Sequence, residues 1–290
     1  MSVEMPLFPL RSVLCPGVAL PLHIFEERYR LMVARCIERG EPFGVVLVRE
    51  GPDVGPIDGR MAEIGTTAAI RRAGRYPDGR LDILTVGEQR FRLESVDLEK
   101  EPYIVARVSF LEEPTGPPEQ VRDRAERVGR RFLRYLDLLQ PDGDADGPEI
   151  EIEFEIEVDD DEAAEAAGDA VTDAVETAEL DDVTEDVNGA EPLVAEMDAE
   201  DLSPEQRREL LMAAARRLAS TDDPTALSYV LTALIQVDLA ARQELLEAPD
   251  TVERLDRLEG LLTRESWFLQ QGLRPIIIDA NQPSPGSTPT

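Results

Sequence analysis

Two short apolar segments, each interrupted by proline, open the chain and restrict what its N-terminal part can form. Proline has no backbone N–H to donate to a neighbouring strand, so it suits the start of a strand or the edge of a sheet and breaks a helix. The dipeptide Pro16-Gly17 separates the two segments and is typical of a tight turn. The sequence therefore predicts two short strands around a turn, and the prolines within them are Pro6, Pro9 and Pro21.

A helix and further strands follow this opening. Apolar residues at positions 29, 32, 33, 36 and 37 have helical spacing, which predicts a helix from Glu26 to Arg39 that ends at Gly40. Later apolar runs at 43–48, 62–72, 81–86, 90–96 and 103–110 have the length of strands, and a turn at 76–79 makes a hairpin of the second and third. Their mixed alternation predicts half-buried antiparallel strands in a small barrel or sandwich.

The pattern then changes to helices, which makes the fold class α+β. Apolar residues with helical spacing run from 119 to 139, and a capped helix is expected over 203–220. Asp223 precedes the next helix, Asp238 is placed as the N-cap of the one after it, and Asp250 or Thr251 as the N-cap of the last, which should end near residue 271.

We therefore divide the chain into a β-rich part (1–115), a helical part (116–140 and 202–272), an acidic insertion (141–201) and a tail (273–290). The tail holds one apolar run, Pro275-Ile276-Ile277-Ile278, which either adds a strand or covers an apolar surface. Its last ten residues are rich in proline and serine, a composition typical of disorder.

The net charge of −31 is concentrated in the insertion. Residues 141–200 hold 25 acidic residues and no basic ones, and taking these from the totals of 61 acidic and 30 basic residues leaves about −6 for the rest. A segment of this composition is predicted to be disordered. Neither part has the basic surface of a nucleic-acid binder.

The sequence also argues against a membrane or secreted protein. No apolar run approaches the length of a transmembrane helix, and the N-terminus lacks the pattern of a secretory signal. The two cysteines are 21 positions apart and give no disulfide framework, so we expect a cytoplasmic protein.

Several motifs, taken in their order along the chain, resemble the N-terminal, substrate-binding domain of Lon proteases. The resemblance covers residues 5–140 and 203–265 and leaves the acidic insertion outside. The motifs are Pro6-Leu7-Phe8-Pro9-Leu10-Arg11, Pro16-Gly17, Leu20-Pro21-Leu22, Phe25-Glu26-x-Arg28-Tyr29, Ile64-Gly65-Thr66, Asp78-Gly79-Arg80, Gly87-Glu88-Gln89-Arg90-Phe91-Arg92, Asp223-Pro224-x-x-Leu227-Ser228-Tyr229, Gln243-Glu244-Leu245-Leu246-Glu247 and Val252-x-Arg254-Leu255.

This resemblance implies a PUA-like pseudobarrel followed by a helical bundle, and a role in engaging protein substrates or peptides. It implies no cofactor and no catalysis. The motif residues are expected to set the backbone geometry and the core: Pro6, Leu7, Pro9, Leu10, Pro16, Gly17, Pro21, Leu22, Phe25, Gly65, Gly87, Arg90 and Phe91.

The residues themselves offer no catalytic centre. Lys100 is the only lysine and Glu101 follows it, which excludes a Gly-Lys-Ser/Thr phosphate loop and leaves an ion-paired surface residue as the better interpretation. His23, the only histidine, is interpreted as a structural or surface residue. Cys15 is expected to be an exposed thiol beside the turn and Cys36 a core residue, and the three together lack the spacing of zinc ligands.

The acidic insertion contains one specific pattern. Asp142, Asp144, Asp146 and Glu153 have the spacing of a calcium-binding EF-hand loop. The strict acidic–apolar alternation of residues 149–158 has the period of a strand, however, where a second helix would be needed. The segment is thus either a calcium loop or a solvated linker, and its alternating part is either a strand that joins a sheet edge or a disordered stretch.

We expect a non-catalytic protein- or peptide-binding module that acts as an adaptor in protein quality control beside a protease or ATPase partner. The alternative is a regulatory protein whose acidic insertion binds calcium or a basic partner. RNA binding would rest on fold analogy alone and is weakened by the charge. The groove between the β-rich part and the helices is the expected peptide site, and the sequence does not specify an oligomeric state.

Overall fold

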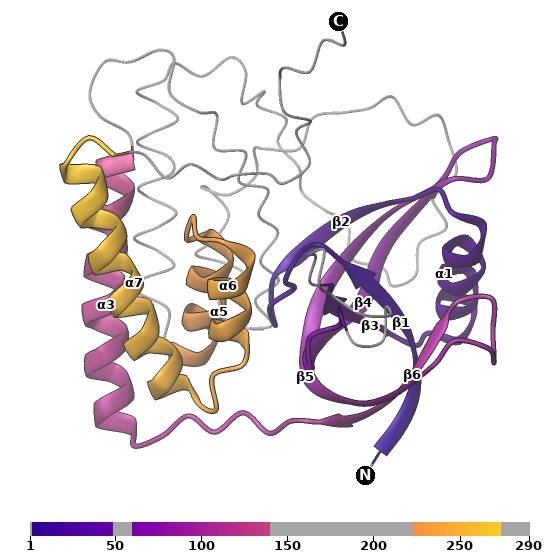
Figure 1. Ribbon diagram of the computed structural model, residues 1–290, viewed down its shortest axis with the longest axis horizontal. Helices are drawn as coiled ribbons and strands as arrows, with labels where there is room; N and C mark the ends of the chain where they lie inside the picture. Colours follow the sequence, from indigo (N-terminus) through magenta and orange to yellow (C-terminus); the bar gives the residue numbers. More distant parts are fainter. Residues whose placement is uncertain (1, 49–59, 140–222, 274–290) are drawn as a thin grey trace, which may run out of the picture.

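The computed structural model describes residues 2–48, 60–139 and 223–273, which form a β-rich part and a helical part side by side (Figure 1). The elements are β1 (Ser2–Leu10), β2 (Ala19–Ile24), α1 (Glu27–Arg39), β3 (Phe43–Leu47), β4 (Ile64–Arg75), β5 (Leu81–Asp97), β6 (Ile104–Phe110), α3 (Pro118–Leu139), α5 (Pro224–Leu234), α6 (Leu239–Leu246) and α7 (Thr251–Gln270). This content agrees with the expected α+β class.

The strands form one sheet that closes on itself. Their order is β2-β5-β4-β3-β1-β6, and an additional pairing of β5 with β6 joins the last five strands into a ring. The long strand β5 makes this possible, because its first half pairs with β2 and its second half pairs with β6. The sheet is therefore a small barrel of five strands, and β2 is added to one edge of β5.

The strands predicted at 81–86 and 90–96 are a single strand, β5, so the prediction of two strands was wrong. A Cβ atom on Gly87 would lie 2.2 Å from the carbonyl oxygen of Cys15, so only glycine fits at this point. The Gly87 N–H donates to the carbonyl of Val18 at 3.0 Å. Glycine is therefore required at position 87 because the backbone of the turn before β2 passes so close. It does not mark a turn between two strands.

The pairing of β1 with β3 is parallel, which corrects the expectation of an antiparallel sheet. The chain between them contains β2 and α1, and a parallel pair requires a long crossover of this kind. The other pairings in the sheet are antiparallel, and the 76–79 turn makes the predicted hairpin of β4 and β5.

The prolines lie where a strand has one unpaired side. In β1, the pairing with β6 covers Ser2 to Leu7 and the pairing with β3 covers Leu7 to Leu10. Pro6 therefore lacks a β3 partner and Pro9 lacks a β6 partner. Pro21 lies in β2, the edge strand of the sheet. A missing N–H costs least at such positions.

Two apolar clusters hold the β-rich part together. One takes side chains from all five ring strands, and the second packs the buried face of α1 against the sheet. Cys15 is completely buried in the first cluster, so the expectation of an exposed thiol was wrong. Burial raises the pKa of this thiol to about 12, which leaves it unreactive. Cys36 is a core residue of α1, as expected.

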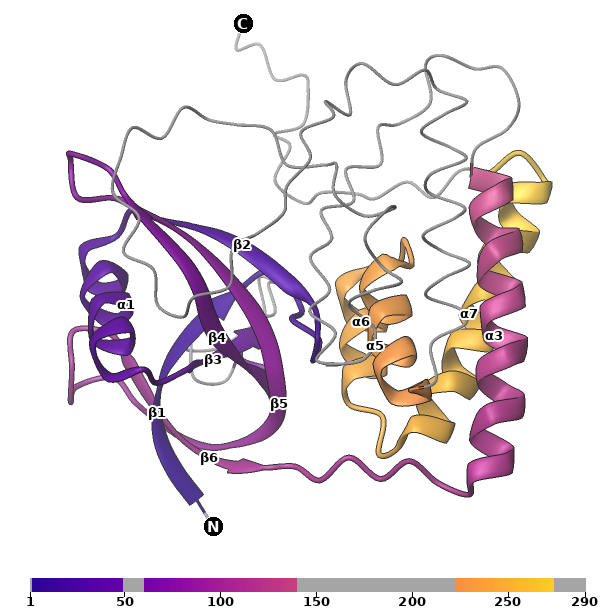
Figure 2. The ribbon, with the colours of Figure 1, turned by 180° about the vertical axis from the view of Figure 1, so that it is seen from behind.

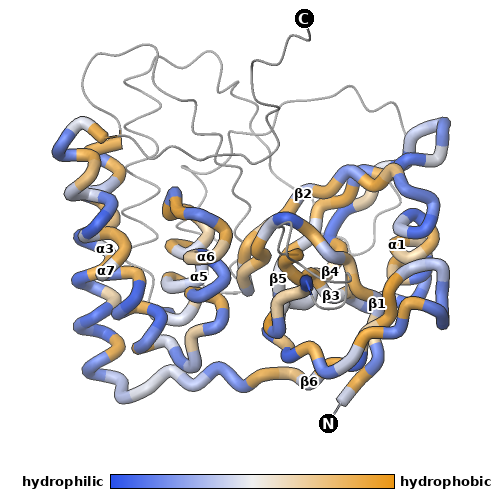
Figure 3. The backbone as a smooth tube through the Cα atoms, viewed as in Figure 1, coloured by the Kyte–Doolittle hydropathy of each residue, from blue (hydrophilic) through white to orange (hydrophobic). Residues whose placement is uncertain are grey.

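The long helices α3 and α7 lie side by side and run in the same direction. Arg124 bonds Asp256 at 2.7 Å and Arg127 pairs with Glu259 at 3.4 Å, so the contacts advance together along both helices. The short helices α5 and α6 lie between this pair and the sheet in both views (Figures 1 and 2). The tube coloured by hydropathy shows both long helices alternating hydrophobic and hydrophilic stretches (Figure 3).

The predicted helix caps are confirmed. Asp223 accepts hydrogen bonds from two backbone N–H groups in the first turn of α5, and Asp238 and Asp250 each accept one in α6 and α7. Gly40 ends α1 with a φ of 63°, in the left-handed region. Within the described ranges, no helix combines the length and the hydrophobicity needed to cross a bilayer.

Candidate functional site

A buried polar network joins the barrel to the helices, and Arg90 on β5 is its first member. The Arg90 side chain is only 2% exposed. Its Nη1 donates to the carbonyls of Leu246 and Ala248, both at 2.7 Å. Its Nε and Nη2 donate to the carboxylate of Glu113 at 2.5 and 3.1 Å. This one strand residue thus hydrogen-bonds backbone carbonyls at the end of α6 and the carboxylate of Glu113, which lies in the segment that connects the two parts.

A second buried arginine completes the network from α7. Arg254 has no exposed surface and donates to the Ser228 hydroxyl at 3.0 Å and the Tyr229 hydroxyl at 2.7 Å. Its guanidinium lies 3.7 Å from the centre of the Tyr229 ring. Tyr229 in turn donates to Glu113 at 2.7 Å. Burial lowers the pKa of the Arg254 guanidinium and raises the pKa of the Tyr229 phenol.

This network makes the junction a packed contact at that position. Tyr229 and Leu246 share an apolar cluster with the barrel strands, and Gln243 of α6 donates to the carbonyl of Ile64 on β4 at 2.9 Å. Two buried cations share one carboxylate, which stabilises one relative placement of the two parts. The side chains around Arg90 therefore contact one another directly across the junction.

The most exposed large apolar side chain of the described residues lies elsewhere, between β2 and α1. Phe25 is 65% exposed and stacks on His23 with ring centres 6.2 Å apart. His23 Nδ1 lies 2.5 Å from an oxygen of Asp82, whose other oxygen accepts a hydrogen bond from the Tyr76 hydroxyl. Arg80 lies over the Tyr76 ring, 5.3 Å from its centre. We call these five residues the Phe25 surface.

Local sequence explains how this surface is held. Gly79 has a φ of 85° and allows the tight turn that returns β4 into β5. Arg30 of α1 donates to the carbonyl of Asp78 at 3.3 Å, which fastens the turn to the helix. Partial burial of the Asp82 carboxylate acts to raise its pKa, but the hydrogen bonds from Tyr76 and His23 outweigh it and lower the pKa overall.

The open edge of β2 borders the Phe25 surface. The bond from the Gly87 N–H to the Val18 carbonyl sets the alternation, so that Ala19, Pro21 and His23 direct their backbone groups away from β5. No described strand pairs with this edge. Because Pro21 has no N–H, the outward-facing donors of this edge are the backbone N–H groups of Ala19 and His23.

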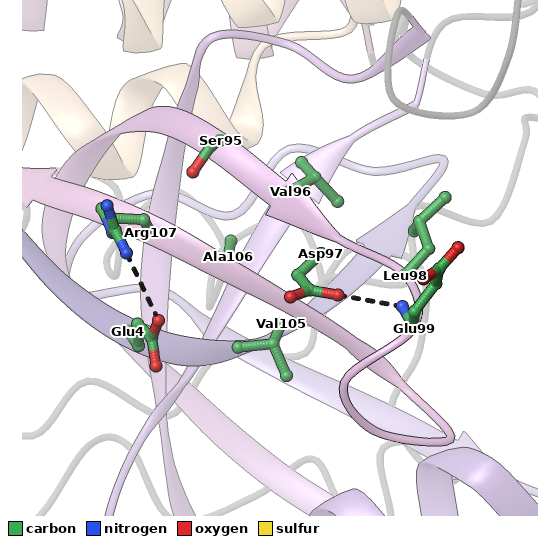
Figure 4. Close-up of a pocket in the computed structure, with 9 residues that line it drawn as sticks. All are labelled: Glu4, Ser95, Val96, Asp97, Leu98, Glu99, Val105, Ala106 and Arg107. Atoms are coloured by element: carbon green, nitrogen blue, oxygen red, sulfur yellow. Dashed lines mark hydrogen bonds and ion pairs between the residues drawn. The ribbon is translucent and has the colours of Figure 1, made fainter.

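A shallow pocket of about 370 Å³ lies on the β5–β6 hairpin, beside the start of β1 (Figure 4). Three of its charged side chains, Glu4, Asp97 and Arg107, have partners. Glu4 pairs with Lys100 at 2.5 Å and Arg107 at 3.6 Å, while Asp97 accepts the Glu99 N–H at 2.9 Å. The hydrogen bond from Lys100, more than any other interaction, lowers the pKa of Glu4. Lys100 is thus the ion-paired surface residue that its sequence predicts.

Comparison with known proteins decides the family. Residues 4–264 match the family model described as the ATP-dependent protease La (LON) substrate-binding domain. The chain belongs to this family. It is similar to Lon proteases of Flavobacterium johnsoniae (31% identical, 48% of this chain and 16% of the relative) and Porphyromonas gingivalis (32% identical, 38% and 13%). The chain therefore spans only a small fraction of these relatives.

Solved structures show the same fold for the Lon domain. The N-terminal domain of Mycobacterium avium complex Lon protease aligns over 90% of this chain and 98% of its own, with a TM-score of 0.52 and 15% sequence identity. At this identity the likeness concerns the fold alone.

The Lon motif residues occupy strands, turns and the junction. Pro6, Leu7, Pro9 and Leu10 lie in β1, Pro16 and Gly17 in the turn, Pro21 and Leu22 in β2, Gly65 in β4, and Gly87, Arg90 and Phe91 in β5. Gly17 takes a φ of 73°, and a Cβ on Gly65 would meet the Val45 carbonyl at 2.3 Å. Phe25 is the one large apolar motif residue whose side chain is mostly exposed.

Sequence reasoning did not assemble the network around Arg90. Tyr229 and Arg254 were within the Lon motifs but had no stated role, and Glu113 carried no signal. The calcium loop at 142–153 and the alternating run at 149–158 lie outside the described residues. Within the described part of the chain, no group of three or more His, Cys, Asp or Glu side chains is arranged to hold a metal ion.

Proposed function

We propose that this Lon-family domain is a non-catalytic module that binds extended or unfolded segments of protein substrates at the Phe25 surface. Membership of the substrate-binding family supports the substrate class. The observation that carries the site is the 65% exposure of Phe25 beside an edge of β2 that no described strand covers. We further propose that the domain acts as a cytoplasmic adaptor in protein quality control, with the barrel serving as a PUA-like pseudobarrel and the helices as a bundle.

The chemistry of the surface suits a protein chain. A partner side chain that covers Phe25 gains apolar burial, while His23, Arg80 and Asp82 at its border can hydrogen-bond the partner backbone. The edge of β2 adds two backbone donors, which an extended segment can use by strand addition. The combination recognises backbone and apolar side chains in general, as a binder of many substrates requires.

Binding of a fluorescently labelled, reduced and alkylated protein that stays unfolded tests this proposal. Full burial of a phenylalanine is worth about 1.5–3 kcal/mol, so Phe25→Ala is expected to raise Kd by roughly tenfold. Leu98→Ala is the matched control, because Leu98 is 50% exposed on the β5–β6 hairpin. If F25A binds as tightly as the unchanged chain, the Phe25 surface is not the site. If neither protein binds the probe, substrate binding itself is contradicted.

A further inference from the structure

A second exposed apolar area lies at the far end of the helical part, where α7 ends beside α3 (Figure 1). Trp267 is 55% exposed and Leu273 is 54% exposed, although both are large apolar residues. The Trp267 ring contacts Phe268 edge-on, with centres 5.2 Å apart. We call Trp267, Phe268 and Leu273 the Trp267 patch. It lies on a different element from the Phe25 surface and does not depend on the proposed function.

The cap of α7 holds Leu273 against the last helical turn, next to this patch. Gly272 takes a φ of 73°, its N–H donates to the Leu269 carbonyl, and the Leu273 N–H donates to the Phe268 carbonyl, each at 3.0 Å. This pair of bonds is a Schellman motif, which reverses the chain and brings the residue after the glycine onto the last helical turn. Leu273, the last residue of the described segment, is therefore held beside the final turn of α7.

The sequence provides a fitting occupant at the right distance. Ile276, Ile277 and Ile278 follow Leu273 by three to five residues, and a chain of that length reaches at most about 10–18 Å. From Asp279 to the end of the printed sequence, the only apolar residue is Ala280. The three isoleucines are thus the apolar run that follows Trp267 most closely in the sequence beyond Leu273.

We propose that residues Ile276–Ile278 pack against the Trp267 patch and shield it from solvent and from other chains. In this arrangement the isoleucines bury their own side chains and cover the indole of Trp267. Without them the indole would face solvent where α3 and α7 end side by side. Removing the cover exposes an apolar area at one end of the molecule, where a second copy can then bind.

Trp267 is the only tryptophan of the chain, so its fluorescence reports this contact directly. The full-length triple variant Ile276→Ser, Ile277→Ser and Ile278→Ser is expected to shift the emission to longer wavelength. Acrylamide quenching of this variant should exceed that of the unchanged chain, because the indole loses its apolar cover. Removal of residues 281–290 is the control and should change neither signal.

A nitroxide on the tail gives an independent reading that does not require the isoleucines to be removed together. Cys15 and Cys36 are buried, at 0% and 3% exposure, so a single introduced cysteine is labelled selectively. A nitroxide on Ile277→Cys should quench Trp267, whereas a nitroxide on Ser287→Cys should not. Equal quenching from both positions, or unchanged fluorescence in the triple variant, overturns the proposal. Shielding that is lost on dilution of the unchanged chain also overturns it, because the occupant is then a second copy.

Discussion

Replacing Arg90 by methionine removes the residue that ties the barrel to the helices while keeping a side chain of similar length. The Arg90 guanidinium makes two hydrogen bonds to buried backbone carbonyls and two to Glu113. Methionine can make none of them. The Leu246 and Ala248 carbonyls are then left unsatisfied in a region where both residues are 1% exposed or less.

The expected loss follows from these groups. Each buried acceptor left without a donor costs about 1–3 kcal/mol, and breaking a buried ion pair by removing one partner costs about 3–5 kcal/mol. The two costs cannot simply be added, because both arise from removing the same guanidinium. Glu113 also keeps Tyr229 and Arg254 as partners, which limits the damage. We therefore expect Arg90→Met to lower the free energy of unfolding by about 3–4 kcal/mol.

Urea denaturation followed by circular dichroism and by Trp267 fluorescence measures this loss in both parts of the molecule. Arg92→Met is the matched control, two residues along the same strand, because Arg92 is 50% exposed and lies 3.5 Å from a mostly solvated Glu63. Such a surface change should stay within about 0.5 kcal/mol. If R90M loses no more stability than R92M, the junction does not depend on the network and the reasoning fails.

Four further changes have defined outcomes. Tyr229→Phe keeps the ring but deprives Glu113 of a donor, so it should cost about 1–2 kcal/mol in the same urea assay; no loss would contradict the network. Gly260→Ala adds a Cβ with nothing within 4 Å on an exposed helical position, so it should raise stability by about 0.5–1 kcal/mol, and a lower melting temperature would contradict this. The pKa of Asp82 is lower in the folded chain than in the unfolded chain, so its carboxylate stabilises the fold above the unfolded pKa, and this stabilisation is lost as the pH falls through the folded pKa. Asp82→Asn should therefore reduce the loss of unfolding free energy at acid pH, measured as a stability–pH profile. An unchanged acid slope would refute this. Calcium titrated into the intact chain should give no calorimetric heat, and a saturable signal abolished by changes in 142–153 would establish the calcium alternative.

The short-range features of the fold could be predicted because neighbouring residues determine them. A cap such as Asp223 needs only its own oxygen and the next two or three N–H groups, and the turn before Leu81 needs only a proline and a glycine in the right order. Helix and strand periodicity likewise depends on spacings of a few residues.

Features that depend on distant segments were predicted wrongly or not at all. The glycine at position 87 suggests a break between two strands, and only the approach of the Cys15 carbonyl explains it as part of one strand. Cys15 next to a turn suggested exposure, yet the barrel strands cover it from residues far along the chain. The exposure of Phe25 could not be inferred either, because apolar residues at the start of a helix are more often buried.

The sequence by itself determined the class of the fold, the positions of the caps and turns, the location of the excess charge and the resemblance to the Lon substrate-binding domain, since each is written in residue order and spacing. Only the tertiary structure decided which side chains meet. Arg90 comes from a strand, Glu113 from the segment that connects β6 to α3, and Arg254 from a helix; the Arg90 contact with Leu246 joins residues 156 positions apart. Such a contact exists only after the ring has closed and the helices have docked, because the packing of whole elements brings the groups within hydrogen-bonding distance.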